Sequence, residues 1–306
     1  MKSFRKVLDS GLRSAGRLLT ALLLSSGVLH AQGQEEAAAP GVVDVQGSAT
    51  VAQIVASAIA PLRAQYGIQA KVITQGGSSG GILAVGAGEA ALGMSTRPIT
   101  GADRAAYPAA IYKEYRLGIQ AMSVMVSRDV WEAGVRVLDR KQLTAIYQRD
   151  VKNWKELGGP DQAIKFYNTE QGRGPWELFA EWLYGDLRRA PLGTEFEKVQ
   201  TGEETRNLVE FNRGSIAVAA ARWVDNKNSF ALGLKLDDGT IVQPTTENFL
   251  NSKYPLVRPL LLVSGDRPTG NLKLMLQFMF SDTGQKLVER AVDGIPQKEL
   301  GELPAF

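Results

Sequence analysis

Three short segments of small polar residues each follow a predicted strand, and their hydroxyl and amide groups could bind an anion. Segment 47–50 (GSAT) lies between a strand and a helix. Its Ser or Thr can cap that helix, and the free N–H groups of the first turn attract negative charge. In segment 76–81 (GGSSGG), the glycines let backbone N–H groups approach a ligand and the serines add hydroxyl donors. Segment 95–98 (STRP) places Arg97, whose planar fork of donors suits an oxyanion, at a strand end.

A fourth segment, 170–176 (EQGRGPW), is rich in glycine and leads into a predicted helix with Pro175 in its first turn. Each segment also has a simpler explanation: an ordinary helix cap, a flexible turn, or the surface ion pair of a lone arginine. Their convergence favours an anion-binding cleft, because open α/β sheets bind ligands beyond the carboxyl ends of their strands. The candidate ligand-binding residues are Ser48, Ala49, Thr50, Ser78, Ser79, Gly80, Ser95, Thr96, Arg97, Glu170, Arg173 and Gly174.

Apolar runs that alternate with helical patterns predict the elements that position these segments. Strands are expected at 42–46, 69–74, 91–95, 164–168 and 215–220, helices at 50–66, 82–87, 139–148, 175–185 and within 270–291, and a hairpin at 230–244. Pro61 should kink or shorten the first helix. Alternating strands and helices with short connections predict an α/β fold with mostly parallel sheets.

Two long apolar strands, 117–127 and 256–264, predict a two-lobed organisation. Lobe one would comprise residues 42–121 plus 256–306, and lobe two residues 122–255. The two strands would then join the lobes as a hinge, with the ligand cleft between the lobes.

The N-terminus has the pattern of a secretory signal peptide. Residues 1–17 carry five Lys and Arg against one Asp, the apolar run 18–29 follows, and Leu29 and Ala31 suit a cleavage site. This run is too short to cross a membrane, which takes about 20 residues. We therefore expect residues 1–31 to be removed as the protein is exported.

The mature chain would contain neither histidine nor cysteine, because the sequence has no Cys and its one His, His30, leaves with the signal. Ser-His-Asp, Cys-His and thiol chemistry are excluded, and His/Cys metal sites with them. We therefore expect no enzyme, no catalytic residue, no metal and no cofactor, although paired carboxylates and Ser-Lys dyads stay open. Five of 35 Lys and Arg and one of 32 Asp and Glu leave with residues 1–31. The resulting balance, 30 against 31, gives no support for a nucleic-acid partner.

Several motifs, in one order along the chain, resemble the phosphate-binding proteins of bacterial ABC transporters, within the type II periplasmic-binding-protein superfamily. They are GSATV at 47–51, the segment 76–99 that ends in STRPI, LTAIY with VKNWKELGG in 143–159, YPLVRPLLLV at 254–263, and FMFSDTGQKLVERAVDGIP at 278–296. The resemblance implies a type II two-lobed fold and a monomer in the periplasm. Its ligand would be phosphate or a similar tetrahedral oxyanion, and its partner a membrane permease.

The sequence departs from this family at the fourth segment, where the family has Arg-x-x-x-Ser-Gly-Thr-aromatic. Thr169 occupies the position of the family arginine, and Arg173 and Pro175 replace the Ser and Thr donors. Arg173 could restore the positive charge, and Glu170 could accept the proton that phosphate keeps and sulfate lacks, or else face solvent. Two alternatives stay open: a sensor or accessory protein with a changed ligand, and a secreted hydrolase that uses carboxylate or serine chemistry.

Overall fold

The computed structural model describes residues 41–169, 174–191 and 196–306. The predicted signal peptide, residues 1–31, lies outside the described residues, and so do Glu170 and Arg173. In the first part of the chain, strands and helices alternate as the sequence predicts. These elements are β1 (Val42–Gly47), α1 (Ala49–Tyr66), β2 (Gln69–Ile73), α2 (Gly77–Gly86), β3 (Leu92–Ser95) and α3 (Gly101–Ala106).

The long strand β4 (Lys113–Ser127) leads into the middle of the chain, and β12 (Val257–Ser264) leads back. Between them lie α4 (Arg128–Glu132), β5 (Val137–Asp139), α5 (Arg140–Tyr147), η1 (Trp154–Leu157), β6 (Lys165–Thr169), α6 (Gly174–Tyr184), η2 (Leu187–Arg189), β7 (Glu197–Val199), α7 (Gly202–Phe211), β8 (Ser215–Ala220), η3 (Ala221–Trp223), β9 (Ser229–Ala231), β10 (Gly233–Lys235), β11 (Ile241–Val242) and α8 (Thr246–Leu250). The chain closes with α9 (Gly270–Met279), α10 (Asp282–Val292), β13 (Ile295–Pro296) and α11 (Gln297–Leu300).

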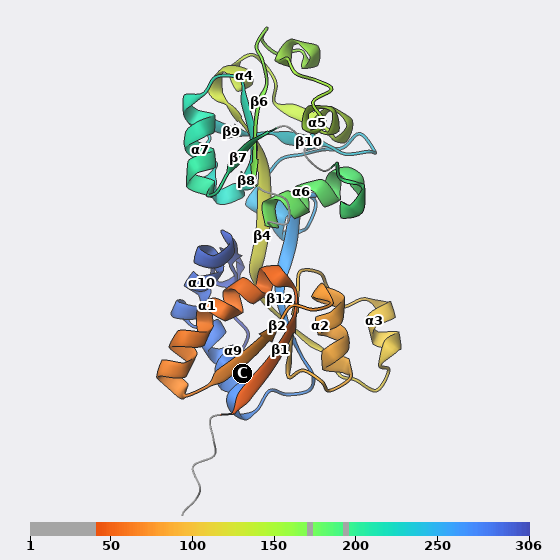
Figure 1. Ribbon diagram of the computed structural model, residues 1–306, viewed down its shortest axis with the longest axis vertical. Coiled ribbons are helices and arrows are strands. Elements are labelled where there is room, and N and C mark those ends of the chain that lie inside the picture. The colour runs from red at the N-terminus through yellow and green to blue at the C-terminus, as the bar shows by residue number, and fades with distance from the viewer. Residues whose placement is uncertain (1–40, 170–173, 192–195) are drawn as a thin grey trace, which may run out of the picture. The chain divides into compact units, whose positions relative to one another are not determined.

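The strands pair in the order β2-β1-β3-β12-β4-β8-β6-β7, and β9 and β13 pair with β4 outside this path. The two long strands lie side by side between the group that contains α1 and the group that contains α6 and α7 (Figure 1). Up to Ala121, β4 pairs with β12, and from Met122 it pairs with β8. This change falls where the sequence divides the two lobes, and the exact lobe boundaries stay a prediction.

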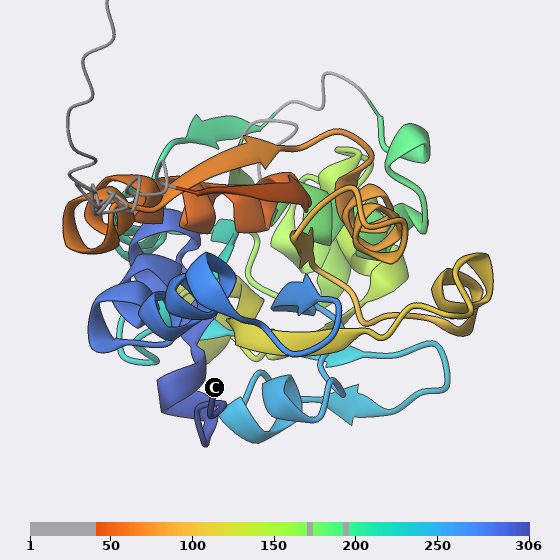
Figure 2. The ribbon, with the colours of Figure 1, turned by 90° about the horizontal axis from the view of Figure 1, so that it is seen from below.

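The two largest hydrophobic clusters of the described residues match the two groups of strands. One packs β1, β3 and β12 against α1, α9 and α10, with Val45, Ile54 and Leu262 fully buried. Figure 2 shows α9 and α10 beside α1, although they come from opposite ends of the described chain. The other core packs the second half of β4, β6 and β8 against α5 and α6. The fold is therefore a two-lobed α/β fold, as the sequence predicts.

The expectation of mostly parallel sheets is wrong, because the sheet is mixed. β1 pairs in parallel with β2 and β3, and β6 with β7 and β8. β12, however, is antiparallel to β3 and β4, and β4 is antiparallel to β8. The reason is topological: the chain leaves the first lobe in β4 and returns in β12, so the two strands run in opposite directions.

Two local predictions also differ from the structure. α2 begins at Gly77 rather than near Ile82, because Gly76 adopts a left-handed conformation (φ 78°) that starts the helix five residues earlier. α1 is not shortened by Pro61 and continues to Tyr66, where Gly67 (φ 68°) caps it. Ala58 and Leu62 beside Pro61 are buried, so tertiary packing offsets the backbone hydrogen bond that proline removes.

No helix within the described residues is long and apolar enough to cross a membrane.

Candidate functional site

The first predicted segment forms the start of α1 and is held against the end of β3. Ser48 accepts a hydrogen bond from Val51 N at 3.5 Å through its Oγ, so it acts as the helix cap, and its own N–H donates to Met94 O at 2.9 Å. Gly47 has φ 140°, and a Cβ at this position would collide with the carbonyl of Met94. A glycine is therefore required for the close approach that sets the helix start beside β3.

The second and third predicted segments are joined by hydrogen bonds. Ser78 Oγ accepts from Thr96 N at 3.0 Å and lies 3.3 Å from Thr96 Oγ1. Ser95 Oγ accepts from Arg97 N at 3.1 Å, and Ser79 Oγ accepts from Arg97 Nη2 at 2.8 Å. The start of α2 and the turn after β3 thus form one polar network. Their role in binding stays a prediction.

Arg97 is already engaged by a carboxylate. Its Nη1 lies 2.7 Å from Asp103 Oδ2 and its Nη2 lies 3.0 Å from Asp103 Oδ1, which is a bidentate pair. Asp103, 6% exposed, also completes a capping box with Thr100 at the start of α3. Hydrogen bonding from Arg97 is the largest of the causes that hold the pKa of Asp103 well below its usual range. Much of the positive charge of Arg97 is therefore compensated before a ligand arrives.

We expect Asp103→Asn to lower the free energy of unfolding at pH 7 by about 1–2 kcal/mol, because it removes the ion pair and weakens the cap. The folded pKa is depressed, so this stability is present above the unfolded carboxyl pKa of about 3.9 and is lost as pH falls through the folded value. Urea unfolding at pH 7, 5 and 3 measures the effect. Asp237→Asn, at an exposed pair with Arg140, is the control and should change little. A difference that did not shrink on acidification would contradict the prediction.

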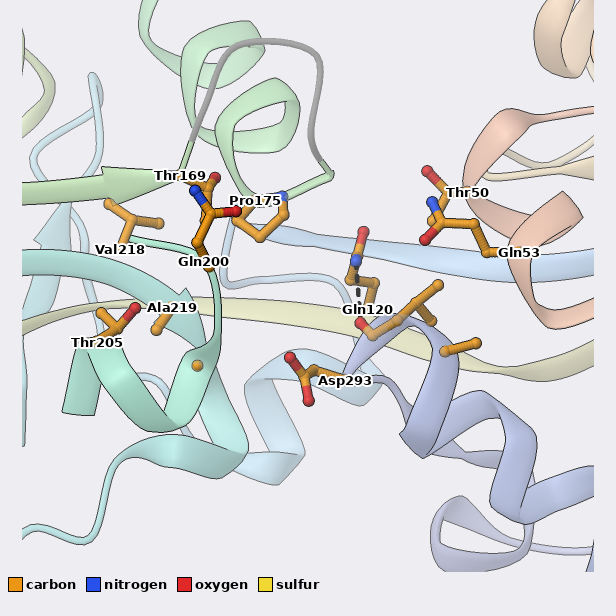
Figure 3. A pocket seen from close by; sticks show the side chains of 13 residues that line it. Thr50, Gln53, Gln120, Thr169, Pro175, Gln200, Thr205, Val218, Ala219 and Asp293 are labelled. Carbon is orange, nitrogen blue, oxygen red and sulfur yellow. Dashed lines mark hydrogen bonds between the residues drawn. The ribbon is translucent and has the colours of Figure 1, made fainter. Parts of the chain in front are cut away.

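A cavity of about 180 Å³ is lined by residues from both lobes beside β4 and is shown in Figure 3. Its polar lining residues are Thr50, Gln53, Gln120, Thr169, Gln200, Thr205 and Asp293. Thr50 and Gln53 come from α1 and face Thr169 and Gln200, which lie beyond Gln120 (Figure 3). The cavity is smaller than the roughly 300–1,000 Å³ of sites for drug-sized ligands, so its size fits a small ion.

A second cavity, of about 610 Å³, lies along β12 and is lined by Thr96, Arg97 and Arg258 among others. The structure thus divides the predicted residues: Thr50 lines the first cavity, and Thr96 and Arg97 line the second. The remaining described candidates in the first lobe are not among the residues that line either cavity; they are Ser48, Ala49, Ser78, Ser79, Gly80 and Ser95. The donor segments of the first lobe therefore do not line one common cavity.

The predicted site residues of the second lobe are only partly described. Gly174 is the first residue of α6, whereas Glu170 and Arg173 lie outside the described residues. Thr169, which occupies the position of the family arginine, ends β6 and lines the first cavity. Within the described part of the chain its buried Oγ1 has no hydrogen-bond partner.

Three polar residues at the hinge were missed by the sequence analysis. Gln120 lies in β4, Arg258 in β12, and Asp293 in a left-handed turn (φ 51°) after α10. A glutamine and an arginine inside long apolar strands were visible signals, because such strands are otherwise buried. Burial raises the pKa of Asp293, and nearby Arg222 opposes this shift. Asp293 had no comparable signal, because acidic residues after a helix are common.

Among the described residues, no group of three or more His, Cys, Asp and Glu side chains could hold a metal ion.

A two-lobed α/β fold with a small polar cavity between lobes joined by two strands is the architecture of a solute-binding protein. Residues 34–283 match the model of the PBP superfamily domain, and the chain belongs to this superfamily.

Several relatives carry names that state their ligand. The chain is similar to the phosphate-binding protein PstS of Bacillus subtilis (strain 168), with 24% identity over 88% of this chain and 85% of the relative. It is 25% identical to PstS of Staphylococcus aureus (strain USA300), over 85% of this chain and 81% of the relative.

Two solved structures share the fold. A possible phosphate-binding protein of Planctomyces limnophilus DSM 3776 has a TM-score of 0.72 at 21% identity, covering 84% of this chain and 94% of its own. An ABC-type phosphate transport receptor of Vibrio cholerae has a TM-score of 0.60 at 23% identity, with coverage of 82% and 98%.

Proposed function

We propose that this chain is an exported, monomeric solute-binding protein that captures phosphate or a similar tetrahedral oxyanion in the periplasm and delivers it to an ABC transporter permease. The observation that carries the proposal is the cavity between the lobes, lined by hydroxyl and amide groups from both. The names of the relatives support phosphate as the ligand. Binding rather than catalysis is supported by the lack of His and Cys after residue 31.

The chemistry of the cavity fits an oxyanion that is held by hydrogen bonds. Thr50 Oγ1, Thr169 Oγ1 and the side-chain amides of Gln53 and Gln200 can each donate to an anionic oxygen. Hydrogen bonds to a charged acceptor are stronger than those between neutral groups. Asp293, as a carboxylate, can only accept, so it favours an anion that still carries a proton and disfavours sulfate.

Because the donors come from both lobes, a bound anion would favour the closed arrangement about β4 and β12. Thr96 and Arg97 line the second cavity and not the first. Closure of the two lobes would bring these donors nearer to the donors of the first cavity.

We expect phosphate to stabilise the mature protein, residues 32–306, by about 4 kcal/mol at a thousand-fold excess over Kd. Chemical unfolding at neutral pH with phosphate, sulfate or acetate measures this, and calorimetry gives each Kd. Phosphate should bind more tightly than sulfate, and acetate should have no effect. Small-angle scattering should show a more compact form with phosphate. If neither phosphate nor sulfate changes stability or produces heat, oxyanion capture is wrong.

A further inference from the structure

Within the described part of the chain, the lining of the first cavity offers its proposed anion no positive side chain, and Arg222, near Asp293, pairs with Glu289. Among the described residues that line it, none is Lys or Arg, and the one charged group is the Asp293 carboxylate. Arg97 does not line this cavity, and both of its terminal nitrogens contact Asp103. A buried anion needs a nearby cation or a dense set of donors, because removal of its hydration is costly.

Arg258 lies at the boundary between the two cavities. Its Nε donates to Gln120 Oε1 at 2.9 Å, and its Nη2 donates to Thr50 Oγ1 at 3.0 Å. Both acceptors line the first cavity, and Arg258 itself lines the second. Its side chain is 12% exposed. The guanidinium therefore lies directly behind two groups that face the proposed ligand.

Among the described residues, no carboxylate lies within hydrogen-bond distance of the Arg258 guanidinium. The hydrogen bonds described for its side chain go to two neutral oxygens, and Glu177 Oε2 lies 3.8 Å from Nη2, beyond hydrogen-bond distance. Arg97, by contrast, has a bidentate partner at 2.7 and 3.0 Å. Burial lowers the pKa of Arg258, and the carboxylates of Glu177 and Glu181 oppose this shift. Burial also raises the pKa of Glu177, which Arg258 opposes and Glu181 reinforces. The arginine stays protonated, and its charged partners are carboxylates beyond hydrogen-bond distance.

Glu177 belongs to the opposite lobe. It lies in the first turn of α6, two residues after Pro175, which also lines the first cavity. Arg258 therefore lies between residues of the first cavity in one lobe, Thr50 and Gln120, and a carboxylate of the other lobe.

We propose that Arg258 is the principal cation of the oxyanion site, and that Glu177 is the counterion with which the oxyanion competes. This inference rests on the proposed function and names the residue that supplies its charge. It offers a source for the charge that the family arginine would supply at Thr169: the hinge strand, in addition to whatever Arg173 contributes. Because β12 pairs directly with β4, a bound anion would contact the hinge itself.

A simpler role for Arg258 would be structural, tying β12 to β4 and α1 through Gln120 and Thr50. The two roles differ in what they predict for Glu177. If Arg258 only ties strands together, a folded Arg258→Lys protein should lose stability but keep its anion affinity. If Arg258 is the cation of the site, the folded variant should bind more weakly, and removal of the competing Glu177 charge should tighten binding.

The test is calorimetry with inorganic phosphate on the mature protein and three variants. Arg258→Lys should weaken binding at least tenfold, because an ammonium cannot contact Thr50, Gln120 and an anion as a planar fork does. Glu177→Gln should tighten binding about three- to tenfold, because the competing carboxylate is gone. Arg140→Gln removes one charge at a distant pair with the exposed Asp237 and should bind as wild type does.

The outcomes distinguish a failure of this inference from a failure of the proposed function. Wild-type affinity in Arg258→Lys would overturn the role of Arg258, and unchanged affinity in Glu177→Gln would overturn the role of Glu177. A lack of phosphate binding by the wild-type protein would instead overturn the proposed function, and this inference with it. If Arg258→Lys fails to fold, tighter binding by Glu177→Gln still supports the proposal, and unchanged binding still counts against it.

Discussion

Replacing Thr50 with valine is expected to weaken phosphate binding about 10- to 100-fold. Thr50 is 5% exposed, lines the cavity between the lobes and contacts Arg258 Nη2 at 3.0 Å through its hydroxyl. Valine keeps the branched shape, so α1 should be preserved while the donor is lost. A hydrogen bond to a charged group is worth about 1.5–3 kcal/mol, and each 1.4 kcal/mol is about a factor of ten.

Calorimetry with phosphate measures this effect, and unfolding without ligand checks the fold. The matched control is Ser57→Ala on the same helix, where an exposed hydroxyl donates to Gln53 O at 2.8 Å. Its phosphate affinity should equal that of the wild type. If Thr50→Val also binds as the wild type does, Thr50 is not a ligand donor and the cavity does not hold the anion as proposed.

Replacing Trp154 with alanine is expected to lower the free energy of unfolding by about 3–5 kcal/mol. Trp154 is fully buried in the core of the second lobe, and its Nε1 donates to Gly214 O at 2.8 Å. The substitution leaves a cavity and removes a hydrogen bond that joins η1 to the turn before β8. Urea unfolding measures the loss, and its midpoint should fall without a large change in slope.

Trp154→Phe separates the two contributions. Phenylalanine keeps most of the buried volume and loses the indole N–H, so the expected loss is smaller, about 1–2 kcal/mol. Trp154 does not line either cavity at the hinge, so phosphate affinity should be unchanged in the folded variants. Equal destabilisation by alanine and phenylalanine would show that the hydrogen bond, and not packing, dominates.

Most strands and helices were predictable from the sequence because they depend on local patterns. The apolar runs at 42–46 and 215–220 form β1 and β8, and the long run at 117–127 forms all of β4 except its first four residues, 113–116. Local patterns failed where packing overrides propensity. Pro61 does not end α1, and the glycines at 80 and 81 lie inside α2, where a Cβ would collide with the backbone at Gln75 and Gln46.

The residue types alone indicated the class of site: no His or Cys follows residue 31, which excludes much of catalysis, and strand-end Ser, Thr and Arg residues favour anion binding. Which of these residues meet depends on the folded chain. Arg258 and Gln120 are register neighbours across β12 and β4, and Arg258 also reaches Thr50, far away in sequence. Asp103 engages Arg97, the arginine that the sequence favoured. Strand register and helix placement depend on long-range packing, which no local spacing encodes, so the hinge arginine became visible only in the folded protein.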